Sequence, residues 1–538
     1  MNTNMKSYIK LLSLGALLAG STACTDLDVD LDNQYTEFPE NPIASLGKYQ
    51  ACYTYFQNVL SRDYKEQILL SSDEFFPVAF GSDYRDVRYS LPYLHMTNAD
   101  NWFNESTFTA MTSGIVYCNN VILEINGGNA TEYAAAAAPV RAVRAFYHFI
   151  LMDVYGDVPI MEFNQEEGVP VDRQPRAKVA EFIEKELLES MDDLSEENSL
   201  NTYGGPNKWM AKALLAKLYL NWGVYTNEIT TVTNDTPNPK LNDCVKVCDD
   251  IIGSGVFEVG TGYRKKFFPD NKLNNRDFIY STAYNVDNGH DWGRYFQFRQ
   301  NNNGTSYWGF PLTQSCGGNI RVNPYMVDLL QALPGDERAK TILGGDVYIY
   351  DPSTYELTGE RFVYNGAPVT FTKDITLVSA DIDMSVTKDI NGWCSGYECV
   401  KYPINNTYNT HSRRQTNDIP IFRYADILLT KAECILRGAT ATNGATVAGL
   451  VDEVRDCSGA PHVQGAFTLQ DLLDERGREF FAELWRRNDL IRYGQFEKER
   501  LYVKEINPNG WNDKNKRLYP IGTAVMNTNT NWTQNPGY

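Results

Sequence analysis

The chain has 538 residues, 43% of them hydrophobic, and its 49 Lys and Arg against 68 Asp and Glu give a formal net charge of −19 at pH 7. This length is enough to bury a large core and allows roughly two to four domains. So strong a negative charge excludes wholesale binding to nucleic acid or to anionic lipid surfaces, because both repel an acidic protein.

The first 23 residues have the pattern of a secretory signal peptide. Two lysines and no acidic residue precede an apolar run at 11–20, which is too short to cross a bilayer as a helix. Small residues then lead into Cys24, as a lipoprotein signal peptidase requires, although Ser21 stands where leucine is commonest. We therefore expect lipidation of Cys24 and an acidic tether over residues 24–40, with ordinary secretion as the alternative.

Apolar residues that recur every three or four positions predict most of the secondary structure. The strongest patterns predict buried helices at 140–154, 207–225, 419–438 and 469–493. Weaker patterns predict helices at 46–60, 106–125 and 176–194. Small residues on these stripes let helices approach closely, but no strict 34-residue repeat is visible.

Between about 227 and 417 the composition changes to Gly, Asn, Asp and aromatic residues. Short alternating runs at 346–350 and 361–364 predict small strands within loops. Because helices precede and follow this stretch, we expect one body over residues 41–538. It would consist of helical blocks 41–226 and 418–538, elaborated by the loop-rich insertion 227–417.

Ten cysteines include Cys24, and the other nine are an odd and scattered set that does not resemble a disulfide framework. Cys244 and Cys248 lie in an apolar helical stretch and are expected to be buried thiols. Cys394 and Cys399 could instead form a local disulfide within a loop. Neither pair has the C-x-x-C spacing of zinc or redox sites, and we expect no metal.

Several segments together resemble one known family. They are RAVRAFYHF at 141–149 with YGDVP at 155–159, WMAKALLAKLYL at 209–220, FRYADILL at 422–429, ERGREF at 475–480 with DLIRYG at 489–494, LYPI at 518–521 and QNPGY at 534–538. In this order, over nearly the whole mature chain, they are similar to the SusD/RagB family of surface glycan-binding lipoproteins of Bacteroidetes. Gly477 and Ala482 depart mildly from the family pattern.

The resemblance implies a mainly α fold, in which tetratricopeptide-type helix pairs form a superhelical body beside a loop-rich half with small β elements. It also implies an outer-membrane lipoprotein, facing outside, that binds a polysaccharide or oligosaccharide. Such a protein delivers its ligand to a TonB-dependent, SusC-like transporter without catalysis. It needs no cofactor.

A glycan site needs flat aromatic rings beside planar hydrogen-bonding groups, because sugar rings present C–H patches and dense hydroxyls. In the family, the segment after the acidic pair at 73–74 often supplies a platform. This position suggests Phe80 and Tyr84 as platforms, with Asp83 and Arg85 as hydroxyl partners. The alternative is that Phe75 and Phe76 belong to the core and that the residues after them form a surface turn without a binding role.

A second candidate cluster contains Trp292, Tyr307 and Trp308. These aromatic residues stand among asparagines and glycines and lack apolar neighbours in the sequence, which favours exposure on loops. By contrast, Trp102 and Trp209 lie in helical patterns and are expected in the core.

The chain shows no local signature of an enzyme. Its five histidines are scattered, and no H-E-x-x-H, nucleophile elbow, P-loop or dinucleotide fingerprint occurs. A structural or peptide-binding cap on the transporter remains an alternative. A glycoside hydrolase is a more distant one, since two carboxylates brought together by folding leave no spacing to recognise.

Overall fold

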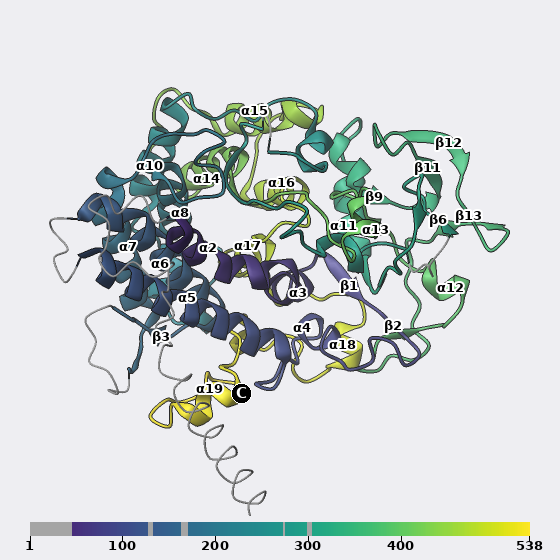
Figure 1. Ribbon diagram of the computed structural model, residues 1–538, viewed down its shortest axis with the longest axis horizontal. Coiled ribbons are helices and arrows are strands. Elements are labelled where there is room, and N and C mark those ends of the chain that lie inside the picture. The colour runs from purple at the N-terminus through teal and green to yellow at the C-terminus, as the bar shows by residue number, and fades with distance from the viewer. Residues whose placement is uncertain (1–45, 127–132, 163–170, 273–274, 299–303) are drawn as a thin grey trace, which may run out of the picture. The chain divides into compact units, whose positions relative to one another are not determined.

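The computed structural model describes residues 46–126, 133–162, 171–272, 275–298 and 304–538 (Figure 1). Contacts divide the chain into Met1–Ser45 and Leu46–Tyr538, and the description below concerns the second unit. The expected signal peptide, Cys24 and the tether lie outside the described residues. Among the described helices, none combines the length and apolar character needed to cross a membrane.

Helices dominate this unit. The longer ones are α2 (Leu46–Val59), α3 (Lys65–Ser71), α5 (Trp102–Asn126), α6 (Ala134–Tyr155), α7 (Arg176–Ser190), α8 (Lys208–Leu220), α9 (Trp222–Thr226), α10 (Leu241–Gly253), α11 (Pro324–Gln331), α14 (Tyr424–Leu436), α15 (Val447–Ser458), α16 (Leu469–Glu479), α17 (Arg486–Arg492) and α19 (Thr523–Thr528). Short turns of helix are α4 (Ser90–Tyr93), α12 (Ile390–Trp393), α13 (Thr407–Thr410) and α18 (Val503–Ile506).

Helices that follow one another in the chain pack side by side. Helix α2 contacts α5, α5 contacts α6, and α6 contacts α7; farther along, α8 contacts α10, α10 contacts α14, and α14 contacts α15 (Figure 1). Local sequence sets the helix ends: the Asn207 side chain accepts a hydrogen bond from the Met210 N–H at the start of α8, and Gly459, with φ 69°, ends α15. The mainly α body that the resemblance implies is confirmed.

Two predicted helices are wrong in detail. The stretch 419–438 begins as strand β18 (Ile419–Arg423), paired antiparallel with β5 (Phe278–Thr282), before α14 starts. The stretch 469–493 is two helices, because Ala482 adopts φ 59° and donates its N–H to Glu74 Oε1, 2.8 Å away. A left-handed residue cannot continue a right-handed helix.

Short strand pairs order the loop-rich region, two of them with a partner strand from residues 75–80, and the alternating runs at 346–350 and 361–364 predicted some of these strands. The pairs are β1 (Phe75–Pro77) with β8 (Ile320–Val322), β2 (Ala79–Phe80) with β16 (Ser385–Val386), β6 (Gly304–Thr305) with β7 (Pro311–Leu312), β9 (Ile342–Leu343) with β17 (Glu398–Cys399), β10 (Gly345–Asp346) with β15 (Thr370–Phe371), β11 (Tyr348–Tyr350) with β12 (Leu357–Arg361), and β13 (Val363–Tyr364) with β14 (Ala367–Pro368). A further pair, β3 (Val158–Pro159) with β4 (Arg173–Gln174), lies among the first helices. Helix α10 falls inside the range expected to be loop-rich.

An aromatic core fills the loop-rich region between residues 298 and 408. Its Trp308 ring stacks on Tyr350 with centroids 5.0 Å apart, and the Trp308 Nε1–H and the Tyr307 hydroxyl both donate to Gln297 Oε1 at 2.6 Å. Phe362 packs edge-on against Tyr307. Large rings from distant segments therefore replace regular secondary structure as the source of burial here.

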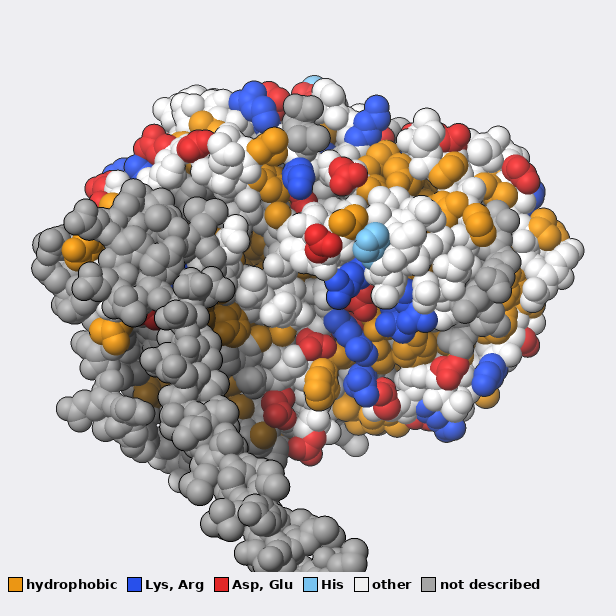
Figure 2. Space-filling model, viewed as in Figure 1, with side chains coloured by type: hydrophobic (Ala, Val, Ile, Leu, Met, Phe, Trp, Pro, Cys, Tyr) orange, Lys and Arg blue, Asp and Glu red, His pale blue; other side chains and the backbone are white. Residues whose placement is uncertain are grey.

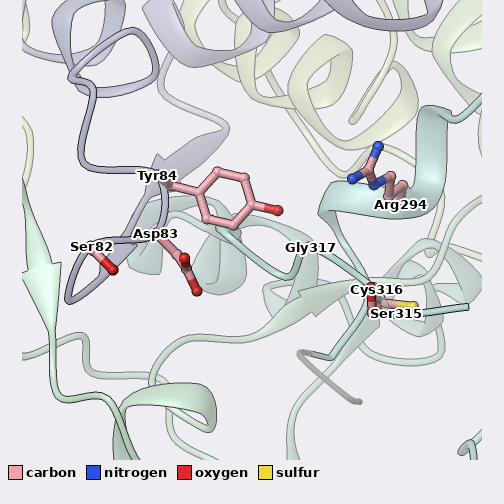
Figure 3. Close-up of a pocket in the computed structure, with 7 residues that line it drawn as sticks. All are labelled: Ser82, Asp83, Tyr84, Arg294, Ser315, Cys316 and Gly317. Carbon is pink, nitrogen blue, oxygen red and sulfur yellow. The ribbon is translucent and has the colours of Figure 1, made fainter. Parts of the chain in front are cut away.

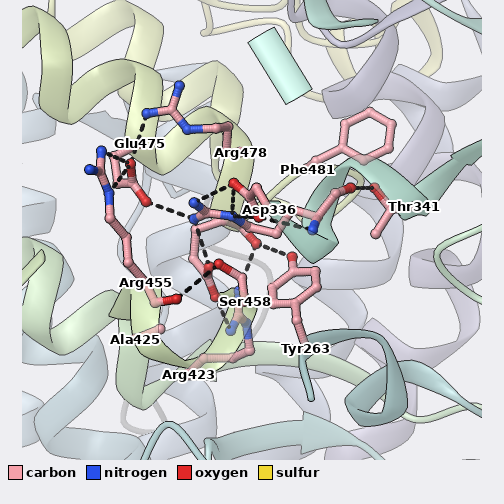
Figure 4. A network of polar contacts seen from close by, with 12 residues as sticks. Tyr263, Asp336, Thr341, Arg423, Ala425, Arg455, Ser458, Glu475, Arg478 and Phe481 are labelled. Carbon is pink, nitrogen blue, oxygen red and sulfur yellow. Dashed lines mark hydrogen bonds and ion pairs between the residues drawn. The ribbon is translucent and has the colours of Figure 1, made fainter. Parts of the chain in front are cut away.

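A buried network of ion pairs joins the loop-rich region to α16 (Figure 4). Arg423 contacts Asp277 at 2.7 Å and Glu479 at 2.8 Å, while Arg338 contacts Glu475 at 2.7 Å and Glu479 at 3.1 Å. Burial alone would raise the pKa of Glu475, but the surrounding arginines, Arg338 first, hold it well below its usual range. Glu475 therefore stays charged at neutral pH.

The nine described cysteines are free and buried. Cys394 and Cys399 therefore form no disulfide, and Cys244 and Cys248 are buried thiols, as expected. Burial raises the pKa of the Cys316 thiol to about 12.

Candidate ligand-binding site

A pocket of about 390 Å³ opens beside strand β2 (Figure 3). Three segments distant in the sequence meet there: the turn after β2, a 3₁₀ turn at Trp292–Tyr295, and the stretch before β8. The lining residues are Ser82, Asp83, Tyr84, Arg294, Ser315, Cys316 and Gly317.

The first wall is a tight turn. Phe80 and Asp83 exchange backbone hydrogen bonds of 2.9 and 3.1 Å, and Gly81 adopts φ 63°. Strand β2 pairs in parallel with β16, and the fully buried Phe80 ring anchors the turn to the core. The turn therefore presents Asp83 and Tyr84 to the pocket from a fixed base.

The Tyr84 ring forms the centre of the pocket wall. It contacts Tyr89 and Tyr295 edge-on, with centroids 5.5 and 6.4 Å away, and its hydroxyl points toward Gly317 (Figure 3). A Cβ added to Gly317 would lie 2.6 Å from the Tyr84 hydroxyl oxygen and 3.0 Å from Tyr295 Cδ1. Only glycine at position 317 leaves room for this ring.

The opposite wall carries Arg294 and the Ser315 segment. The Arg294 guanidinium lies 5.1 Å from the centroid of the Tyr295 ring and 3.9 Å from the Asp291 carboxylate. Burial opposes its charge, but Tyr295, Tyr84 and Asp291 raise the pKa of Arg294 overall. Behind this wall, Arg413 Nη2 donates to Ser315 Oγ at 3.0 Å.

The structure brings only part of the first predicted cluster to this pocket. Asp83 and Tyr84 line it. Arg85 is exposed next to it and forms an ion pair with Asp383. Phe80 has no exposed surface, so its predicted role as a platform is wrong.

The second predicted cluster is buried. Trp292 is 0% exposed, Trp308 1% and Tyr307 2%, so the prediction that these aromatic residues are exposed platforms is wrong. Their apolar neighbours come from distant segments: Tyr350 packs on Trp308, and Tyr402 packs on Trp292. The polar residues next to them in sequence carry no information about these contacts.

Sequence reasoning missed other residues that face solvent or the pocket. The stretch Ser315–Gly317 and Arg413 gave no local signal except the glycine pair at 317–318. Trp102, expected in the core, is 61% exposed at the start of α5, whereas Trp209 is buried as expected.

The pocket offers an aromatic ring, hydroxyls, a guanidinium and one carboxylate. These groups suit hydrogen bonding to a hydroxyl-rich ligand, with the tyrosine ring as a contact for C–H groups. Most glycosidases use two carboxylates on either side of the scissile bond. Of the residues that line this pocket, only Asp83 carries a carboxylate.

Comparisons with known proteins agree with this architecture. The SusD family model matches residues 276–538, and a second model, described as starch-binding and associating with the outer membrane, matches residues 75–220. The starch-binding protein SusD of Bacteroides thetaiotaomicron is 25% identical over 470 residues, which cover 81% of this chain and 78% of that relative. A SusD-like protein of Bacteroides ovatus is 23% identical over 422 residues, covering 76% and 68% of the two chains.

Solved structures share the fold. A laminarin-binding SusD-like protein has a TM-score of 0.67 at 20% identity and covers 91% of this chain and 99% of its own. Surface glycan-binding protein A from Bacteroides thetaiotaomicron, in complex with laminarihexaose, also has a TM-score of 0.67, at 18% identity, with 91% and 98% covered. The helix-pair body with a loop-rich half is thus the SusD-like fold, and the chain belongs to the SusD/RagB family.

Proposed function

We propose that this protein binds a polysaccharide or oligosaccharide in the Tyr84 pocket and delivers it to a SusC-like TonB-dependent transporter, without catalysis. The observation that carries the proposal is the pocket itself, which places the Tyr84 ring between Asp83 and Arg294 in a chain of the SusD/RagB family. Carbohydrate binding and outer-membrane association are the properties by which the matched family and relative are described.

The proposed location follows from the sequence outside the described residues. Lipidation of Cys24 would anchor the chain in the outer membrane, facing outside, with residues 24–40 as the tether and 41–538 as one body. Cys24→Ala should then abolish incorporation of a fatty-acid analogue in cells. Label retained by this variant would contradict the anchor, and protease shaving of intact cells tests the orientation.

The central experiment compares two tyrosines in the loop-rich half. Tyr84→Ala removes the ring from the pocket, and we expect it to lower the affinity for a bound glycan about tenfold, since the lost ring contact corresponds to about 1.4 kcal/mol. Tyr348→Ala is the matched control, because Tyr348 is a half-buried tyrosine that does not line the pocket. Calorimetry measures affinity, and circular dichroism checks folding.

The same preparation separates the alternatives. Release of reducing sugar would indicate a glycoside hydrolase rather than a binding protein. Binding of no saccharide in a broad panel, together with retained association with the transporter, would favour a structural or peptide-binding cap. Equal glycan affinity in Tyr84→Ala and Tyr348→Ala would place the site elsewhere.

A further inference from the structure

Three arginines from separate segments surround the pocket of this acidic protein. Arg294 lines it, Arg413 donates to its Ser315, and Arg62 donates to the Tyr89 hydroxyl at 3.1 Å, with its guanidinium 5.5 Å from the Tyr295 centroid. Figure 2 shows Lys and Arg side chains gathered in a row near the middle of one face. A basic group at this place contrasts with the net charge of −19.

These arginines are weakly neutralised. Arg62 and Arg413 form no ion pair within the described part of the chain, and the nearest carboxylate contact of Arg294 is Asp291 at 3.9 Å. In the same described residues, the buried Nε atoms of all three have no hydrogen-bond partner. Of the three, Arg294 lines the pocket, so its guanidinium faces a ligand there.

The acids near the pocket do not cancel this charge. Glu66 is buried near Arg62, but burial raises the pKa of Glu66 to about 8, so this carboxyl is largely protonated at neutral pH. Asp383 and Asp86 are paired with Arg85 and Arg88. Asp63 near Arg62, Asp83 in the pocket lining and Asp291 near Arg294 are the other acids around the three arginines.

We infer that the pocket takes a saccharide that carries a negatively charged substituent, a carboxylate or a sulfate, bound by Arg294, while Arg413 behind Ser315 adds to the positive charge of that wall. The planar guanidinium fork matches the two oxygens of such groups, and a neutral sugar would leave these charges without a partner. The inference rests on the proposed function and specifies its ligand class.

The first test is a panel of polysaccharides in matched pairs. Polygalacturonate and alginate are compared with their carboxyl-reduced forms, and chondroitin sulfate and heparin with their desulfated forms; starch and laminarin represent neutral glycans. We expect at least one acidic polymer to bind by calorimetry and to lose about tenfold or more in affinity when its charged groups are removed. Comparing the carboxyl-reduced and desulfated arms distinguishes the two substituents. Raising the salt concentration should weaken this binding, because salt screens partly exposed charges.

The second test uses variants with opposite expected effects. Arg294→Gln should lower the affinity for the acidic polymer about tenfold and Arg413→Gln should lower it less, whereas Asp83→Asn should raise it. Arg294→Lys keeps the charge but loses the fork and should fall between wild type and Arg294→Gln. Lys178→Gln, an exposed change on α7 with the same effect on net charge, is the control and should leave affinity unchanged.

The outcomes separate the inference from the proposed function. Tight binding of starch or laminarin, insensitive to salt and to Arg294→Gln, would overturn the inference and leave the proposed function standing. An acidic polymer that binds with equal affinity after its charges are removed would also overturn it. If no saccharide in the panel binds, both the proposed function and the inference about its ligand are wrong. Thermal denaturation of each variant shows whether lost binding reflects lost folding.

Discussion

The two halves of this protein bury very different chemistry. Around α16 and α17 the interior is crowded with ion pairs, and Arg423, Glu475 and Glu479 are almost fully buried. Between residues 298 and 408 the interior is instead built from aromatic rings such as Trp308, Tyr350 and Phe362. The helices already satisfy their own backbone groups, whereas the loop-rich half depends on side chains from distant segments for its order.

This difference suggests different responses to mutation. A buried ion network is sensitive to the loss of any one member, because the remaining charges stay buried without a partner. An aromatic core loses stability with the area and hydrogen bonds removed.

Arg423→Leu should have the largest effect. It removes the partner of Asp277, Glu479 and Glu483, and we expect a loss of about 3 to 5 kcal/mol in the free energy of unfolding. Urea denaturation measures it, with Lys178→Leu at an exposed ion pair as the control, expected to change stability by less than about 1 kcal/mol. Equal midpoints for the two variants would show that the buried network contributes no more than a surface pair.

Trp308→Phe tests the aromatic half. The change removes the Nε1–H bond to Gln297 and part of the stack on Tyr350, and we expect a loss of about 2 to 3 kcal/mol. If the loop-rich half opens separately, hydrogen exchange should increase there before it increases in α5 and α6. A uniform increase over both halves would argue that they unfold as one unit.

Glu74→Gln tests the junction of the two halves, where two neighbouring carboxyl groups have pKa values shifted in opposite directions. Arg486 holds the pKa of Asp73 below its usual value despite burial, while burial raises the pKa of Glu74 to about 8. The protonated form of Glu74 therefore contributes stability at low pH that is lost as pH rises from about 4.5 to about 8. Glu74→Gln should reduce the fall in unfolding free energy between pH 7 and pH 8 by about 1 kcal/mol.

The Gln side chain retains an acceptor for the Ala482 N–H, so this variant isolates the charge. An unchanged slope with pH would mean that Glu74 is ionised in the folded protein. The Asp73 contribution has the opposite sign, since it is lost as pH falls below about 4, and should persist in the variant.

The helical part of the fold could be predicted because its signal is local. The stripes at 140–154 and 207–225 fall within α6 and α8–α9. The errors lie where tertiary contacts override the pattern: Ile419–Arg423 pairs with β5, and Ala482 turns to donate to Glu74, which lies 408 residues away. No local pattern reports such contacts.

The pocket was predicted only where one continuous segment supplies it. Asp83 and Tyr84 come from a single turn, and both line the pocket. The second wall is formed by Arg294 and Ser315 together, and their meeting depends on the fold of the loop-rich half. The prediction that Trp308 is exposed was wrong because its glycine and asparagine neighbours indicate a loop in the backbone. They do not indicate which residues from distant segments surround the ring.

The reaction rates of the buried cysteines would report how often each half of the molecule opens. Cys394 and Cys316 lie in the aromatic half and Cys434 lies in α14, and burial raises the pKa of Cys394 to about 11. A thiol attacks an alkylating reagent as the thiolate, so these side chains react slowly until the surrounding structure opens. Iodoacetamide alkylates each cysteine at a rate that mass spectrometry can measure. The order in which the cysteines react would therefore show which half opens more often by local unfolding.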